Sequence, residues 1–192
     1  MKRVHSFYFV HYLILIFLFF CLGISSVSAQ KYLTRQGHIQ FFSEAPLENI
    51  EANNHEVNCA LDIFTGNIVL KVPMAEFKFQ KSLMEKHFNE NYVESEKYPY
   101  ATFKGKVTNL SAIDFLKEGT YPALIAGELT IHGVTKRIAE KGVFHVKEGK
   151  ISGKSVFPVL LKDYKIKIPK IVFYNIAEEI VISVAISLDK AE

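Results

Sequence analysis

The chain has 192 residues, with 23 Lys and Arg, 20 Asp and Glu, and two Cys. A chain of this length predicts one domain that can bury a real core. A formal charge of only +3 gives no reason to expect nucleic acid as a partner.

The first 29 residues have the anatomy of a secretory signal peptide. Lys2 and Arg3 precede an almost wholly apolar run over 7–24, and 27–29 reads Val-Ser-Ala, a small-residue cleavage pattern. We therefore expect cleavage after Ala29, a periplasmic or secreted product, and a single domain over 30–192. Because the leader holds two basic residues and no acidic one, its removal lowers the formal charge from +3 to +1.

The alternative for this segment is a retained anchor, because the apolar run is close to membrane-spanning length. A lipoprotein signal is excluded, since Phe20 precedes Cys21 where a small residue would be required. After cleavage of the signal peptide, Cys59 would be the only cysteine left, so no internal disulfide can form. We expect Cys59 to be a small buried strand residue, and the alternative is a reactive thiol.

Most of the remaining chain alternates with a period of two, which predicts β-strands. The clearest case is 178–188, where Ile180, Ile182, Val184, Ile186 and Leu188 share one face. Turn residues at 65–67, 118–120, 147–150 and 152–153 separate the candidates, and 111–119 reads as a longer loop. The predicted strands are 37–43, 56–63, 67–73, 102–108, 123–132, 137–147, 165–168 and 178–188.

One segment has helical spacing instead. Leu83, Met84 and Phe88 are apolar, and we expect a helix over 82–89 in which Ser82 and Glu85 form a capping box. Beside a barrel mouth, such a helix would act as a lid or a plug.

Strands with one apolar face must pair with another apolar face or close on themselves. So little helix is predicted that helices cannot cover the sheet. About eight strands would form a closed barrel that holds one small ligand or fills with side chains. We therefore predict an all-β, antiparallel, lipocalin-like barrel with one short helix near its mouth; a filled sandwich without a cavity is the alternative.

Three motifs in order sharpen this expectation. His87-Phe88 ends the helix, 98–103 reads Tyr-Pro-Tyr-Ala-Thr-Phe, and 129–136 reads Leu-Thr-Ile-His-Gly-Val-Thr-Lys. Together they resemble the YceI-like family. Met84-Glu85 stands where that family often has Arg-Asp, which indicates a divergent member. The resemblance implies an exported barrel with a long isoprenoid or related lipid chain in its cavity.

We expect the ligand to be held by burial of apolar surface rather than by a charged anchor. His87 is the polar candidate, because it could bind a headgroup or a quinone oxygen; its alternative role is to hold the helix in place. The other candidates are apolar residues that could instead be plain core. The predicted cavity residues are Ile39, Phe41, Leu70, Phe77, Phe79, Met84, His87, Phe88, Phe103, Leu129, Ile131, Ile182 and Val184.

The sequence lacks the motifs of common catalytic and metal sites. It has no Gly-x-Ser-x-Gly elbow, no His-Glu-x-x-His and no Cys-pair spacing, so we expect no cofactor, no metal and no enzyme. Lys162, Lys165, Lys167 and Lys170 should form a solvated strand face, or else a weak basic strip for transient membrane contact.

Three functions remain open at this point. The first is an exported binder of an isoprenoid-like or fatty-chain lipid. The second is an envelope structural or interaction β-domain without ligand. The third is a small exported hydrolase or isomerase that uses His87 with Glu85.

Overall fold

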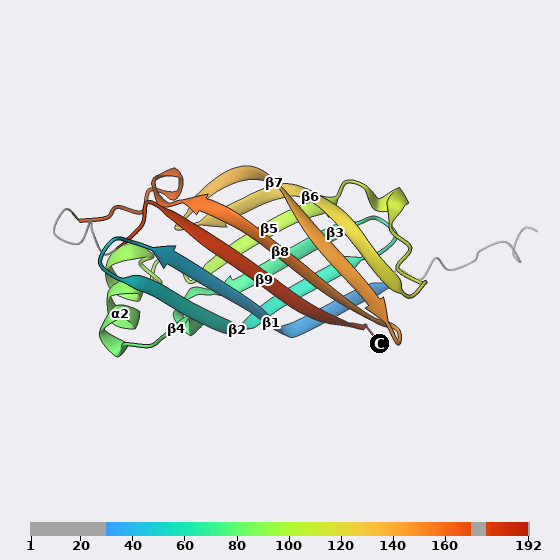
Figure 1. The fold of residues 1–192 in the computed structure, drawn as a ribbon, viewed down its shortest axis with the longest axis horizontal. Coiled ribbons are helices and arrows are strands. Elements are labelled where there is room, and N and C mark those ends of the chain that lie inside the picture. Colours follow the sequence, from blue (N-terminus) through green and yellow to red (C-terminus); the bar gives the residue numbers. More distant parts are fainter. Residues whose placement is uncertain (1–29, 170–175, 192) are drawn as a thin grey trace, which may run out of the picture.

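The computed structural model describes residues 30–169 and 176–191, so the predicted signal peptide and Lys170 lie outside the described residues. Nine antiparallel strands form one sheet in the order β1-β9-β8-β7-β6-β5-β3-β2-β4. Pairing between β1 and β2 closes eight of them into a barrel (Figure 1). The predicted barrel of about eight strands is confirmed.

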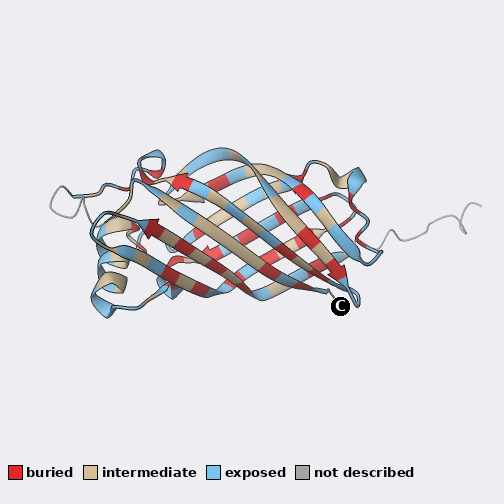
Figure 2. Cartoon of the chain, viewed as in Figure 1, coloured by how far each residue is buried: buried red, intermediate tan, exposed pale blue. Residues whose placement is uncertain are grey.

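Most of the predicted strands are longer than the sequence indicated, whereas β3 has its predicted bounds. Their bounds are β1 Lys31–Glu44, β2 Asn49–Asp62, β3 Asn67–Pro73, β4 Lys78–Phe79, β5 Tyr100–Val107, β6 Gly119–Ile131, β7 Val134–Lys147, β8 Lys150–Leu160 and β9 Glu179–Lys190. Short helical segments connect them: η1 Met74–Glu76, α2 Ser82–His87, η2 Phe88–Tyr92, η3 Leu110–Ala112 and η4 Leu161–Tyr164. Buried and exposed residues alternate along the strands, as a half-buried sheet requires (Figure 2).

Two predictions about the second half of the chain were wrong. Ser152-Gly153 is not a turn but lies inside β8, a strand that the pattern did not reveal. Lys165–Ile168 is not a strand: η4 ends just before it, and Lys165 has a left-handed φ of 58° that an extended strand cannot contain. Tyr164 and Ile166 are nonetheless buried, while the three described lysines of this segment are exposed.

The barrel is solid at one end. The most deeply buried large side chains lie where β2, β5, β7, β8 and β9 approach the end opposite α2 (Figure 1). They include Leu61, Val107, Phe144, Ile151 and Leu188, each with 2% exposure or less. This plug of side chains supplies a conventional hydrophobic core, so the barrel does not depend on a ligand at that end.

Cys59 is buried on β2, as predicted for a small strand residue. Burial raises the pKa of its thiol to about 12, so the thiol stays protonated at pH 8 and is a poor nucleophile. We expect no alkylation of Cys59 by iodoacetamide in the native protein and full alkylation in denaturant, as read by intact-mass spectrometry. Native labelling at the rate of a free thiol would contradict this burial.

Candidate functional site: an apolar cavity under the helix

The other end of the barrel is hollow. A cavity of about 420 Å³ lies between the strands there, within the range of small-molecule sites. Its wall is almost entirely aliphatic and aromatic, and residues from all eight barrel strands, as well as α2 and η2, contribute. Phe144 from the solid end forms part of the floor. The filled-sandwich alternative therefore does not hold.

Four phenylalanine rings gather at the helix end of the cavity. Phe41 lies 5.4 Å from Phe77, 5.6 Å from Phe79 and 5.4 Å from Phe88, measured between ring centroids. Phe88 also lies 5.1 Å from Phe79 and 5.6 Å from Phe77. These are favourable aromatic separations, and they join β1, β4 and η2 into one apolar cap.

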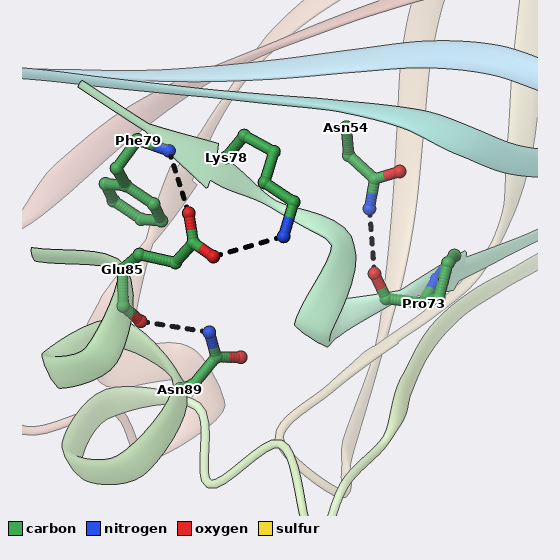
Figure 3. Close-up of polar contacts among 6 residues, drawn as sticks. All are labelled: Asn54, Pro73, Lys78, Phe79, Glu85 and Asn89. Atoms are coloured by element: carbon green, nitrogen blue, oxygen red, sulfur yellow. Dashed lines mark hydrogen bonds and ion pairs between the residues drawn. The ribbon is translucent and has the colours of Figure 1, made fainter. Parts of the chain in front are cut away.

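Glu85 fastens α2 to the rim of the barrel. Its carboxylate lies 3.1 Å from Lys78 Nζ and accepts a hydrogen bond from the backbone N–H of Phe79 at 3.4 Å (Figure 3). Asn89 Nδ2 donates to the Glu85 carbonyl at 2.9 Å. The predicted capping box is wrong: Lys81 is the N-cap residue and Ser82 lies inside the helix, while Glu85 turns to β4 instead.

The structure places all thirteen predicted residues on the cavity wall. Ile39, Phe41, Leu70, Phe77, Phe79, Met84, His87, Phe88, Phe103, Leu129, Ile131, Ile182 and Val184 each line it. Their contact with a ligand stays a prediction. Tyr92, which the sequence did not suggest, lines the cavity as well, and burial raises the pKa of its phenol, so its hydroxyl group is protonated at neutral pH and can donate a hydrogen bond.

The proposed His87–Glu85 pair does not form a catalytic arrangement. Glu85 is engaged by Lys78 and Phe79, and no hydrogen bond joins it to His87 among residues 30–169 and 176–191. Within the same residues, no cluster of three His, Cys, Asp or Glu side chains could hold a metal ion.

Sequence analysis did not predict the hydrogen bonds by which His132 joins two loops. His132, which has a positive φ of 50° in the β6–β7 turn, lies with Nε2 2.6 Å from Glu94 Oε2 and Nδ1 3.2 Å from the Tyr164 carbonyl oxygen. Both partners are acceptors, so the imidazole links the loop before β5 to η4. The sequence assigned His132 only to the turn, because its partners lie more than thirty residues away.

Glu140 is the second polar residue that sequence analysis overlooked. It lies in the inward row of β7, which also holds Ile138, Gly142, Phe144 and Val146, and it lines the cavity. The alternation alone could have revealed it, because a carboxylate interrupts an otherwise apolar face.

Within residues 30–169 and 176–191, no helix has the length and apolar character needed to cross a bilayer.

Solved structures share this architecture. A polyisoprenoid binding domain from Saccharophagus degradans, implicated in plant cell wall breakdown, superposes with a TM-score of 0.74 at 11% identity, covering 85% of this chain and all of that one. BcnA from Burkholderia cenocepacia gives 0.61 at 12% identity, covering 79% and 95%. A Campylobacter jejuni YCEI protein gives 0.59 at 17% identity, covering 78% and 89%.

At these identities the superpositions show a common fold, and a search of curated proteins found no match. The family assignment comes from the sequence profile. The model of the YceI-like domain matches residues 27–188, which is most of the chain and includes every strand except the last two residues of β9. The chain therefore belongs to the YceI-like domain family.

Proposed function

We propose that the protein is an exported lipid-binding protein, which holds an isoprenoid-like or other long-chain amphiphile in its barrel. The observation that carries this proposal is the hollow half of the barrel, whose wall is apolar and whose end is capped by four phenylalanines. The polyisoprenoid binding described for the Saccharophagus degradans domain supports the same class of ligand.

Burial of a hydrocarbon chain supplies enough free energy for such a site. Each buried CH₂ contributes roughly 0.8 kcal/mol, so ten of them contribute about 8 kcal/mol before the cost of ordering the chain. No charged anchor is required for binding of this strength. The N-terminal pattern over 1–29 supports export, and the near-neutral remainder of the chain fits a lipid rather than a polyanion.

The helix end also has features suited to brief contact with a membrane surface. Leu47, in the β1–β2 turn, and Leu83, in α2, are 72% and 61% exposed. An ion pair between Glu48 and Lys81 joins these two segments, and Figure 1 shows them at the same end of the barrel. Two exposed leucines at the end of the barrel that holds the cavity would enter the lipid interface during such contact.

The test is native mass spectrometry of protein purified from an expressing bacterium, followed by organic extraction and lipid analysis. We expect a bound species that is released by solvent, and uptake of a dansyl-labelled fatty probe by the delipidated protein. Protein that carries no extractable lipid and takes up neither a fatty nor a prenyl probe would refute the proposal.

A further inference from the structure

The barrel wall has a window between β7 and β8. These strands pair only from Gly142–Ser155 to Lys147–Lys150, whereas β6 pairs with β7, and β8 with β9, along almost their whole lengths. Beyond Gly142 the two strands separate, which leaves Val134–Lys141 and Val156–Leu160 without a partner on their facing edges among the described residues (Figure 1).

The window is framed at both ends by specific contacts. At the paired end, Ser155 Oγ donates a hydrogen bond to the Lys141 carbonyl at 2.7 Å, where the ladder stops. At the other end, His132 binds the Tyr164 carbonyl and Lys136 lies 4.0 Å from Asp163, so η4 is held across to β7. Between these contacts the free edge of β8 spans five residues, about 16 Å at strand rise.

The short pairing of β2 with β3 leaves a second break in the barrel, and this break is closed by other contacts. β2 and β3 pair over only a few residues, but there the fully buried Asn54 donates to the Pro73 carbonyl at 2.7 Å and β4 pairs with β2 beyond it (Figure 3). Among the described residues, no buried side chain makes a hydrogen bond across the β7–β8 break beyond the Ser155–Lys141 contact. Pro158 in its free edge fits a strand that needs no donor there, since proline cannot contribute to a ladder.

The cavity reaches this break. Ile138 and Glu140 on β7, and Phe157 and Val159 on β8, line it from both sides of the window. The cavity therefore lies directly behind the part of the wall where β7 and β8 are unpaired.

Glu140 places a carboxylate on the cavity wall beside the window. Its position in the inward row, opposite Ile125 of β6, directs the carboxylate toward the cavity rather than the solvent. It has no ion-pair partner within 4.0 Å among the described residues, unlike Glu48, the other cavity-lining carboxylate, which binds Lys81. An ionised carboxylate only accepts hydrogen bonds, so the group that lies against it must donate.

We propose that the β7–β8 window is the route by which the amphiphile enters and leaves the barrel, with Glu140 contacting its polar end. This inference rests on the proposed lipid-binding function. It predicts that ligands ending in a hydroxyl or an ammonium group bind better than ligands of the same chain length ending in a diphosphate, because the carboxylate repels an anion.

The route is tested by obstructing the window. Val156, 63% exposed on its edge and outside the cavity wall, is replaced by Cys and coupled to a 5-kDa polyethylene glycol maleimide, in chains that also carry Cys21→Ser. Val69→Cys with the same polymer is the matched control, because β3 lies four strands from β8 around the barrel and Val69 is 42% exposed. The buried Cys59 should not react.

Exchange of a dansyl-labelled fatty probe is then followed by stopped-flow fluorescence. We expect the polymer at residue 156 to slow exchange about tenfold or more, with little change for the polymer at residue 69, because access governs the association rate. Ala139→Cys, on the other edge of the window, should repeat the effect. Exchange that is unchanged at both window positions overturns the route.

The headgroup assignment is tested at equilibrium with geranylgeraniol, geranylgeranylamine and geranylgeranyl diphosphate. In Glu140→Gln the preference for the amine over the diphosphate should fall about tenfold, since the charge is lost while the side-chain size is kept. An unchanged preference overturns the role of Glu140. If no probe binds to the unmodified protein, the proposed function itself fails. This outcome differs from a failure of the route or of the headgroup assignment, because both of those tests require a protein that binds the probe.

Discussion

Leu70→Trp is expected to weaken uptake of a long-chain probe about 100-fold. Leu70 points from β3 into the cavity, on the wall opposite β8, so an indole there occupies the space of the ligand and not the β7–β8 window. Displacing four methylene contacts removes about 3 kcal/mol of binding free energy, which corresponds to roughly two powers of ten in affinity.

The same variant reports on the hollow directly. The chain contains no tryptophan, so the new indole is its only one and its emission maximum records whether it lies in an apolar environment. Because the ring enters open space, we expect little loss of stability, whereas overfilling a packed core costs about 1–3 kcal/mol. Fluorescence titration and thermal unfolding on one sample measure both effects.

Val69→Trp is the matched control. Val69 is the neighbouring residue on the same strand, but its side chain faces solvent, so its indole should emit at long wavelength and leave uptake unchanged. Equal loss of uptake in both variants would show that β3, rather than the cavity, had been disturbed. A strongly destabilised Leu70→Trp with solvent-like emission would mean that this half of the barrel is not hollow.

The face of each cavity residue could be predicted from the sequence because strand alternation is a local property. Ile182 and Val184 lie on the cavity side of β9, as the uninterrupted pattern over 178–188 predicts. The same reasoning applied to β7 would have identified Glu140. What alternation cannot determine is the depth of the hollow, because inward residues line a cavity at one end of the barrel and pack into a core at the other.

β8 was missed for tertiary reasons. Gly153 reads as a turn residue, yet it lies within the strand because a side chain there would meet the Phe144 ring at about 3.0 Å. Pro158 normally argues against a strand, and it is tolerated at an edge that has no partner across the window. Neither reason can be seen without the neighbouring strand.

Gly127→Ala is expected to lower the free energy of unfolding by about 3 kcal/mol or more, because the added methyl group would clash with packed backbone that cannot relax easily. Gly127 on β6 pairs directly with Gly105 on β5, and a Cβ at Gly127 would lie closer than 3.0 Å to the Gly105 Cα and the Lys104 carbonyl oxygen. For a domain of this size the melting temperature should fall by about 6–12 °C.

Gly119→Ala, at the start of the same strand, is the control. The three atoms nearest to a Cβ there all belong to the Tyr121 side chain, which can move, so the change should stay within about 0.5 kcal/mol. Circular dichroism melts of the two variants and the unmodified protein make the comparison. Similar melting temperatures for Gly127→Ala and Gly119→Ala would show that β5 and β6 do not approach closely at this rung.

The close approach of β5 and β6 matters for the cavity because the ring of Phe103 packs against the glycine pair. The Phe103 ring folds over Gly105, where a Cβ would lie closer than 3.0 Å to the ring, and Phe103 forms part of the cavity wall. The two facing glycines therefore give this ring its place on the wall, and Phe103 is itself paired with Leu129, another residue of the wall. Alanine at residue 127 should push the strands apart and displace the ring, so probe affinity should fall in the folded fraction as well as stability. A destabilised variant that keeps full affinity when folded would separate the glycine pair from the shape of the cavity.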